Sequence, residues 1–315
     1  MNELNYERVF NVLVNETSSY IVKNHLKAMI LGISGGIDST VVAAICHEVS
    51  KQTGIPLIGR SLPIKNRNDE FEVSKLVGEA FCNDFAVCSM TRLYHAALKE
   101  VYQVENMERH ESTYTIEELE QANGQTKIAN GNIQARLRMM FLYNLASIHK
   151  GLVMSTDNQT EYQLGFWTIH GDVGDFDPIQ DLWKTEVYGL TNYLLGMYYN
   201  LYCEATLDKC KEAREWEQWW KGKYEAMKAS IALTPTDGLG ISNSDLDQIG
   251  AKSYNDVDRV LQTLVCPASP ENDRVQDALA VEIGPETIDK IIKRHRNSGF
   301  KREKSPIYIS RELYK

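Results

Sequence analysis

A glycine-rich turn between an apolar segment and a helical one constrains the fold of this 315-residue chain more than any other feature. Ala28–Ile33 is a short apolar run typical of a buried strand, and Ser34-Gly35-Gly36 follows it directly. The apolar residues from Ser39 to Ser50 then predict a buried helix. A strand–turn–helix unit of this kind directs backbone N–H groups and the positive end of the helix toward one point, which favours binding of an anion such as phosphate.

Strands and helices continue to alternate beyond this turn. Short apolar runs predict strands over Ala28–Ile33, Ile55–Leu62, Asp84–Ser89 and Gly151–Ser155. Apolar residues at helical spacing predict helices over Leu4–Leu26, Ser39–Ser50, Glu70–Phe81, Ala129–His149 and a segment that starts near Lys184. This alternation implies right-handed crossovers and a parallel sheet covered by helices on both faces.

The second half of the chain is less regular. A loop rich in glycine and aspartate covers Gly165–Pro178, and Glu204–Ser230 is charged, has helical periodicity and carries three tryptophans. We interpret Glu204–Ser230 as an amphipathic helix that covers the body of the protein, with an oligomer contact or a ligand lid as alternatives. No internal repeat or low-complexity linker divides the chain, so we expect a single domain over residues 1–315 with an extra helical segment near residues 201–230.

Composition excludes several classes of protein. The chain has 34 Lys and Arg against 43 Asp and Glu, a formal charge of −9, so no broad basic surface is available for nucleic acid. No apolar run approaches the roughly 20 residues that a membrane helix needs, and the amino terminus lacks a secretory leader. The six cysteines form no C-x-x-C pair, which argues against a zinc site or a disulfide framework. We therefore expect a cytoplasmic protein without a nucleic-acid or membrane partner.

The residues of the turn favour nucleotide chemistry. Gly35 and Gly36 let the backbone approach a phosphate closely, and the neighbouring hydroxyls can donate hydrogen bonds. Asp38 would repel phosphates unless a divalent cation lay between them. Neither a Walker loop nor a G-x-G-x-x-G turn is present. The pattern S-G-G-x-D-S instead resembles the pyrophosphate-binding (PP) loop of the ATP pyrophosphatases, which cleave ATP between the α and β phosphates and adenylylate a carbonyl oxygen.

Further motifs in the same order resemble the NAD synthetase family, whose members amidate deamido-NAD. Loops after the carboxyl ends of parallel strands are where ligands bind in such folds. The resemblance covers roughly Lys27 to Ile309, apart from the segment near Leu201–Ser230. Its motifs are Gly131-Asn-Ile-Gln-Ala-Arg136-Leu-Arg-Met139, Ser155-Thr-Asp-Asn-Gln-Thr-Glu161, Gly165-Phe-Trp-Thr168, Gly171-Asp-Val-Gly-Asp175, Leu182-Trp-Lys184 and Pro235-Thr-Asp-Gly-Leu239.

The resemblance implies a parallel-sheet α/β fold, an adenine nucleotide alpha hydrolase-like (Rossmann-like) three-layer sandwich. It implies that Asp38 and Glu161 bind Mg²⁺, that Asp157 lies near the ammonia site and that Asp157 and Lys184 serve catalysis. The residues it implies for ATP are Gly32, Ile33, Ser34, Gly35, Gly36, Ile37, Asp38, Ser39, Thr156, Lys184 and Thr236. Those it implies for deamido-NAD are Arg136, Asp175 and Lys301.

Some positions depart from the family pattern. Ile169 stands where the family has a lysine, and His170 follows it. Val173 replaces a glycine, and Phe300 replaces a histidine. Arg60 lies one position early relative to the family's R-L-P strand end. The phosphate loop is intact, so the departures concern the dinucleotide contacts.

The resemblance implies a ligase that forms an acyl adenylate from deamido-NAD and ATP and then NAD from ammonia, with release of AMP and pyrophosphate. We expect ammonia as the nitrogen source because only 33 residues precede Ser34, too few for a separate amidase domain. The resemblance also implies a homodimer. The alternatives are another PP-loop ATP pyrophosphatase acting on a different carboxylate or carbonyl substrate, and a non-catalytic nucleotide sensor.

Overall fold

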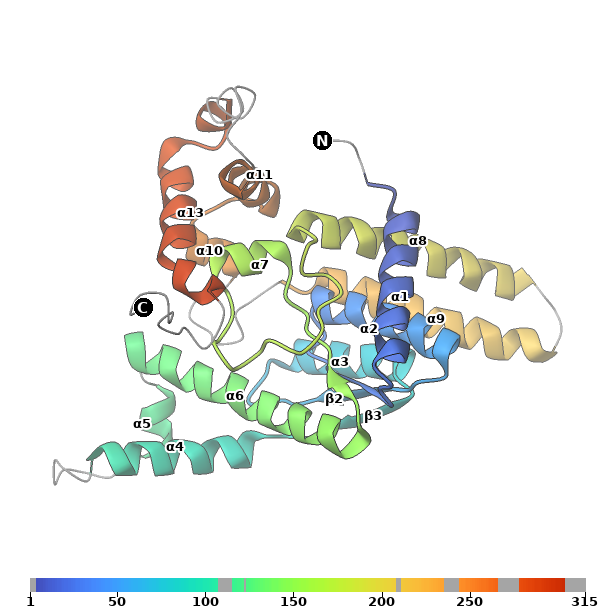
Figure 1. Cartoon of the computed structure of the whole chain (residues 1–315), viewed down its shortest axis with the longest axis horizontal. Coiled ribbons are helices and arrows are strands. Elements are labelled where there is room, and N and C mark those ends of the chain that lie inside the picture. Colours follow the sequence, from blue (N-terminus) through green and yellow to red (C-terminus); the bar gives the residue numbers. More distant parts are fainter. Residues whose placement is uncertain are drawn as a thin grey trace, which may run out of the picture.

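A four-stranded sheet forms the centre of the structure (Figure 1), a computed structural model that describes residues 4–106, 115–121, 123–207, 211–234, 244–265 and 278–303. The strands are β1 (Met29–Gly32), β2 (Leu57–Ser61), β3 (Asp84–Val87) and β4 (Leu152–Val153). They lie in the order β3-β2-β1-β4, and every neighbouring pair is parallel. The four strands expected from the sequence are confirmed, each shorter than its apolar run.

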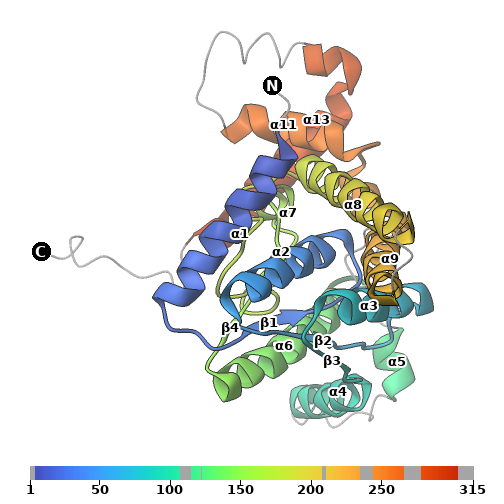
Figure 2. The ribbon, with the colours of Figure 1, turned by 90° about the vertical axis from the view of Figure 1, so that its right-hand side faces the viewer.

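One face of the sheet is covered by α1 (Tyr6–Lys23), α2 (Ile37–Thr53), α3 (Asn68–Phe81), α8 (Lys184–Leu207) and α9 (Lys211–Ala232). Figure 2 shows α1, α2 and α3 on this side and α6 on the other. Met29 and Leu31 of β1 face this layer, because alternate side chains of a strand point to opposite faces. The expected helices near 4–26, 39–50, 70–81 and 184 are therefore confirmed.

The opposite face is covered by α4 (Thr91–Asn106), α5 (Ile116–Glu120) and α6 (Gly124–His149). Ile30 of β1 lies on this side with Tyr94, Leu142 and Ala146. Two helical layers thus enclose the sheet, which confirms the three-layer α/β sandwich. The sequence led us to expect α6 but neither α4 nor α5.

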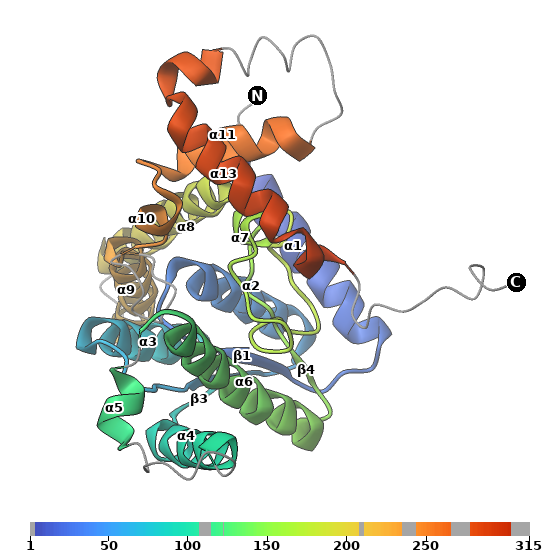
Figure 3. The same cartoon turned by 90° about the vertical axis from the view of Figure 1, so that its left-hand side faces the viewer.

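A third apolar cluster joins α7 (Gln159–Leu164), α10 (Asp245–Ile249), α11 (Tyr254–Val265) and α13 (Pro285–Asn297), and the 3₁₀ helix η1 (Gly299–Arg302) contacts α7 and α13. Figures 1 and 3 show this group beyond one end of the sheet, and α7 connects to it soon after β4. Its core contains Leu164, Ile249, Val257, Leu261 and Ile291. The sequence predicted none of these short helices.

The tryptophan-bearing segment is divided between the end of α8 and α9, which lie side by side in Figures 1 and 2. Lys223, Ala226, Met227 and Ser230 of α9 are buried, at the spacing of one helix face. Residues 211–230 thus form an amphipathic helix that covers the body, as interpreted, whereas residues 204–207 belong to the preceding helix α8. Within the described residues, no helix combines the length and the apolar character needed to cross a bilayer.

Candidate active site

The phosphate loop connects β1 to α2 as the sequence predicted. Helix α2 starts at Ile37, two residues earlier than expected, which places Asp38 in its first turn. The hydroxyls of Ser39 and Thr40 donate to the carbonyl oxygen of Gly36 at 3.0 and 2.9 Å, and the Oγ atoms of Ser34 and Ser39 are 3.0 Å apart. These bonds hold the loop against the helix end, where unpaired N–H groups favour an anion.

Gly35 is required by the close approach of α3 to this loop. Its φ angle is +88°, a backbone conformation that side chains disfavour. A Cβ atom at this position would lie 2.8 Å from the nitrogen of Ser74 and 2.9 Å from the carbonyl oxygen of Glu70. The glycine therefore serves both the torsion and the packing of the loop on α3.

A cleft of about 920 Å³ opens beside the phosphate loop, at the carboxyl ends of the strands. The structure thus brings together most of the residues predicted to bind ATP. Those that line the cleft are Gly32, Ile33, Ser34, Gly36, Ile37, Asp38, Ser39, Thr156 and Lys184. Gly35 does not line the cleft but packs against α3, and Thr236 lies outside the described residues.

Three charged side chains from distant parts of the chain converge in this cleft. The Nζ atom of Lys184 lies 2.5 Å from Oδ2 of Asp38 and 2.9 Å from Oε1 of Glu161. Asn158 joins the group, because its Nδ2 donates to Oδ1 of Asp38 at 2.9 Å while its Oδ1 accepts from the backbone N–H of Glu161 at 3.0 Å. Asn158 and Glu161 thereby form a capping box at the start of α7.

In this group, two carboxylates, Asp38 and Glu161, are paired with a single cation, Lys184. Burial alone would lower the pKa of Lys184, but Asp38 and Glu161 raise it well above its ordinary value, so this lysine stays charged. Burial raises the pKa of Glu161 to about 7, and the Asp38 carboxylate adds to this shift while Lys184 opposes it. Two carboxylates share one ammonium group, which leaves the site with room for further positive charge.

The donor set fits Mg²⁺ better than a metal that needs a complete protein cage. Asp38 and Glu161 offer carboxylate oxygens that already meet at one cation, the Lys184 ammonium. In the described part of the chain, no cluster of three or more His, Cys, Asp or Glu side chains is arranged to hold a metal ion. Mg²⁺ binds through one or two carboxylates together with water and substrate phosphates, which matches two carboxylates beside a phosphate loop.

Asp157 lies in the same cleft with other acidic side chains. Its Oδ2 accepts a hydrogen bond from Oγ of Ser155 at 2.9 Å. Burial raises the pKa of Asp157 well above its ordinary value, with a further contribution from Asp172. Burial also raises the pKa of Asp177 to about 7 and that of Asp172 to about 6. Asp172 and Asp177 are therefore suited to exchange a proton near neutral pH.

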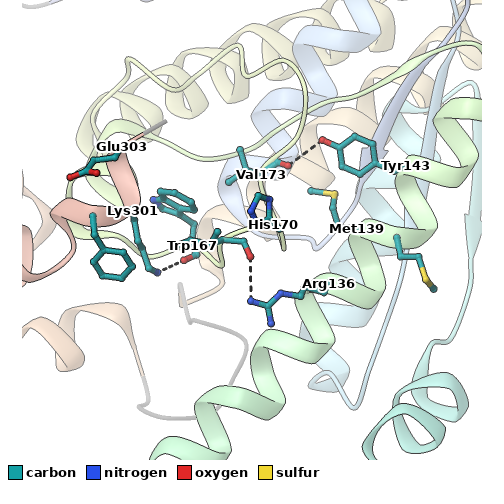
Figure 4. Close-up of a pocket in the computed structure, with 11 residues that line it drawn as sticks. Arg136, Met139, Tyr143, Trp167, His170, Val173, Lys301 and Glu303 are labelled. Atoms are coloured by element: carbon teal, nitrogen blue, oxygen red, sulfur yellow. Dashed lines mark hydrogen bonds between the residues drawn. The ribbon is translucent and has the colours of Figure 1, made fainter. Parts of the chain in front are cut away.

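A second cavity of about 760 Å³ lies between α6, the 167–173 loop and η1 (Figure 4). Arg136 lines it and donates from Nη2 to the carbonyl oxygen of Ile169 at 3.3 Å. Lys301 donates to the carbonyl oxygen of Gly165 at 2.7 Å and to that of Trp167. Lys301 and Trp167 line both this cavity and the first cleft, so the two spaces adjoin.

Two other residues have different surroundings. Asp175 lines neither space: its Oδ2 accepts from the backbone N–H of Val153 and its Oδ1 from the hydroxyl of Tyr143, at 3.0 and 3.1 Å. It fastens the 171–175 loop to β4 and α6. Arg60 forms a two-pronged ion pair with Asp84 at 3.1 and 3.0 Å, although it also lines the first cleft.

Sequence reasoning missed two residues of the candidate site. Asn158 could have been found, because an asparagine followed three residues later by a glutamate is the pattern of a capping box. Arg138 lines the cleft and donates from Nε to the carbonyl oxygen of Leu62 at 3.0 Å. Arg138 lies in the Gly131–Met139 motif, which is the signal that could have found it, although we assigned it no role.

Comparison with known proteins places this geometry in a family. The family model described as NAD synthase matches residues 9–305. An NH(3)-dependent NAD(+) synthetase from Methanococcoides burtonii is 29% identical over 299 residues, which cover 93% of this chain and 91% of that protein. A glutamine-dependent NAD(+) synthetase from Aquifex aeolicus is 30% identical over 189 residues, 59% of this chain and 30% of that protein.

The fold has the same relatives. The solved structure of an NMN synthetase from Francisella tularensis superposes with a TM-score of 0.68 at 22% identity and covers 98% of this chain and 100% of that one. At this identity the superposition shows a shared fold and no more. The match of the family model over almost the whole chain shows that the protein belongs to the NAD synthase family.

Proposed function

We propose that this protein makes NAD by amidating deamido-NAD with ammonia at the expense of ATP. The observation that carries the proposal is the convergence of Asp38, Glu161 and Lys184 beside a phosphate loop, in a cleft that adjoins a second cavity. A reaction between ATP and a second large substrate needs two adjoining spaces of this kind. The relatives do not favour a different ATP pyrophosphatase or a nucleotide sensor.

The first step activates a poor electrophile. The nicotinate carboxylate attacks the α phosphorus of ATP, an acyl adenylate forms, and pyrophosphate leaves. Negative charge develops on the pyrophosphate oxygens, where the Lys184 ammonium and the N–H groups at the start of α2 would stabilise it. Mg²⁺ held by Asp38 and Glu161 would supply additional charge neutralisation at this place.

The second step forms the amide. Ammonia attacks the acyl carbon and displaces AMP, and the attacking nitrogen loses a proton. Burial raises the pKa of Asp157 well above its ordinary value and that of Asp177 to about 7, which makes their carboxylates stronger bases that would accept this proton. The reaction needs no covalent enzyme nucleophile.

Arg136 and Lys301 would bind deamido-NAD in the second cavity. Both are cations beside an apolar lining that includes Met139 and Trp167, which suits a dinucleotide with phosphates and aromatic rings. Asp175 would act through the loop that it fastens. Ammonia is the proposed nitrogen donor, because the ammonia-dependent relative aligns over 91% of its length and the glutamine-dependent one over 30%.

We also propose a cytoplasmic homodimer without a nucleic-acid partner. Exposed apolar side chains gather on α6, on the 173 loop and on η1, with exposed fractions from 37 to 66%. They are Met140, Tyr143, Ile148, Val173 and Phe300, and we call them the apolar edge patch. All except Ile148 also line the second cavity, so a partner subunit seated on the patch would help to close it.

Product analysis tests the proposed activity. The purified protein is incubated with deamido-NAD, ATP, Mg²⁺ and ammonium chloride, and the nucleotides are separated by chromatography. NAD, AMP and pyrophosphate should appear in equal amounts, because each amidation requires one adenylylation. ADP and phosphate, or no NAD, would contradict the proposal.

Asp38→Asn tests the metal role. The amide keeps the shape of the carboxylate but loses its charge, so kcat/KM should fall by about a hundredfold or more. Thermal unfolding should show a folded protein. Asp69→Asn is the control, because Asp69 is an exposed acid in the first turn of α3 that pairs with Arg67. Equal activity and equal Mg²⁺ dependence in the two variants would exclude Asp38 as a ligand.

A further inference from the structure

Side chains from the carboxyl-terminal helices converge on the last turn of α7. This helix has six residues, so most of its carbonyl groups lack a partner within the helix. The carbonyl oxygen of Gln163 accepts from Nη1 of Arg302 at 2.7 Å, from Nδ1 of His295 at 3.1 Å and from Oγ of Ser298 at 3.3 Å. External donors therefore complete a helix that is too short to be stable alone.

Arg302 is the centre of this contact. In addition to Gln163, its Nη1 donates to Oγ of Ser298 at 3.0 Å, and its Nη2 donates to the carbonyl oxygen of His295 at 2.7 Å. The planar guanidinium thus joins η1, the end of α13 and the end of α7 with one rigid group. A lysine has no such fork and could not reach both carbonyl oxygens in this geometry.

The other end of α7 belongs to the candidate active site. Asn158 begins the helix and bonds to Asp38, and Glu161 occupies its first turn and bonds to Lys184. A shift or unwinding of α7 would therefore move Glu161 relative to Asp38. The same helix is held at one end by the site and at the other by Arg302.

We propose that Arg302 is a positioning residue for the amidation reaction: by holding α7 it sets the place of the Glu161 carboxylate. Arg302 lines neither the cleft nor the second cavity, so it does not act by touching a substrate there. Its effect on the Mg²⁺ requirement rests on the proposed function, whereas its effect on α7 does not.

Arg302→Gln is the informative variant, because glutamine keeps a polar side chain but loses the charged fork. Arg296→Gln is the matched control: Arg296 lies on α13, is exposed, and within the described residues its side chain makes no hydrogen bond. Amide hydrogen exchange is followed by mass spectrometry in metal-free protein, for peptides that cover residues 158–167. The same variants are then assayed for NAD formation over a range of Mg²⁺ concentrations.

Loss of hydrogen bonds to a charged donor should speed exchange in the 158–167 peptides by about tenfold or more. Exchange in peptides from α2 should stay as in the unsubstituted protein. The Mg²⁺ concentration for half-maximal activity should rise by about tenfold. In the variant, part of the free energy of Mg²⁺ binding is used to order α7, so the apparent affinity for Mg²⁺ is lower. At saturating Mg²⁺, kcat should recover to within about threefold of the unsubstituted enzyme. Addition of guanidinium at millimolar concentration to Arg302→Ala should restore part of the Mg²⁺ affinity.

Unchanged exchange in Arg302→Gln relative to Arg296→Gln would overturn the proposal. An equal loss of kcat at every Mg²⁺ concentration would also overturn it. If Arg302→Gln does not fold, Arg302→Lys is measured in the same way, with the same two results expected. Should the unsubstituted protein form no NAD, the proposed function fails, while the exchange comparison still decides whether Arg302 orders α7.

Discussion

Gly35 and Gly54 flank the two ends of α2 and both have positive φ angles, +88° and +72°. They differ in their surroundings. A Cβ atom at Gly35 would meet the backbone of α3 at 2.8 Å, whereas one at Gly54 would have nothing within 4 Å. Substituting each glycine by alanine therefore separates two contributions to the free energy of unfolding: the unfavourable torsion alone at Gly54, and the torsion together with displacement of the phosphate loop at Gly35.

Gly54→Ala should lower the free energy of unfolding by about 1–2 kcal/mol, the cost of a left-handed torsion in a residue with a side chain. Gly35→Ala should lower it further and should also raise the KM for ATP, because the loop must move away from α3. Urea titration and steady-state kinetics measure the two effects. Equal destabilisation with an unchanged KM for ATP would show that the contact with α3 does not shape the loop.

Ile169, which stands where the family has a lysine, lines the second cavity. Its carbonyl oxygen holds Arg136. Ile169→Lys should lower the KM for deamido-NAD by about tenfold, because a charged hydrogen bond contributes about 1.5–3 kcal/mol. The KM for ATP should stay unchanged, since Ile169 does not line the ATP cleft.

Steady-state kinetics with each substrate varied in turn provides the measurement for Ile169→Lys. Leu207→Lys is its control, because Leu207 is 82% exposed at the end of α8. A matching change in both Michaelis constants, or the same change in the control, would mean that Ile169 does not occupy the family's lysine position.

At the scale of elements, α9 is fastened to α3 through a buried lysine. Lys223 is fully buried, and its Nζ donates to the carbonyl oxygen of Ala80 at 2.6 Å and lies 3.1 Å from Nε2 of His47. The rings of Phe81 and Trp219 lie 4.6 and 4.4 Å from the same atom. Ala80 and Phe81 are the last residues of α3, the helix that contacts the phosphate loop. Lys223 of α9 therefore caps the carboxyl end of α3.

Burial lowers the pKa of Lys223 from 10.5 to about 7. Between these values the unfolded chain binds a proton that the folded protein does not, so stability rises with pH in this window and is lost as pH falls toward 7. The slope from this one group reaches about 1.4 kcal/mol per pH unit. Lys223→Met should remove that slope between pH 7.5 and 8.5.

Urea unfolding at the two pH values measures the slope for Lys223. The range stays below pH 9 because burial raises the pKa of Cys82 to about 12, which acts in the opposite direction at higher pH. Lys290→Met is the control, since Lys290 is exposed and paired with Glu286. Parallel pH dependence in Lys223→Met and the unsubstituted protein would contradict the assignment.

At the scale of the whole molecule, the apolar edge patch is the place to test the proposed homodimer. Light scattering at micromolar concentration should give the mass of a dimer, because an exposed apolar patch of this kind is normally covered. Met140→Glu combined with Ile148→Glu should yield monomers and a raised KM for deamido-NAD, since a partner would close the second cavity. Val281→Glu is the control, with Val281 87% exposed and away from the patch. A fully active monomer would contradict the proposal.

Much of the sandwich was predictable from local pattern. The β1–α2 unit is a continuous stretch of sequence, so the apolar run, the two glycines and the buried helix define the phosphate loop without help from the rest of the chain. Helices α4, α10, α11 and α13 were not predicted. Apolar residues do recur at helical spacing in α4, α11 and α13, so local pattern could have indicated these three helices. It could not show their partners, which lie far away in the sequence, as Leu164 does from Ile249 and Ile291.

The sequence by itself determined which residues are candidates for the active site, because residue type and local spacing carry the phosphate loop and the resemblance to the family. Only the tertiary structure decided how they are joined. Asp38, Glu161 and Lys184 are 23 to 146 positions apart, yet they meet at one ammonium group. Asp175 accepts a hydrogen bond from the backbone of β4 and so holds its own loop in place, and Arg302 donates to a carbonyl oxygen of α7. The physical reason is that burial and hydrogen-bond partners depend on the packing of distant segments, which no local pattern contains.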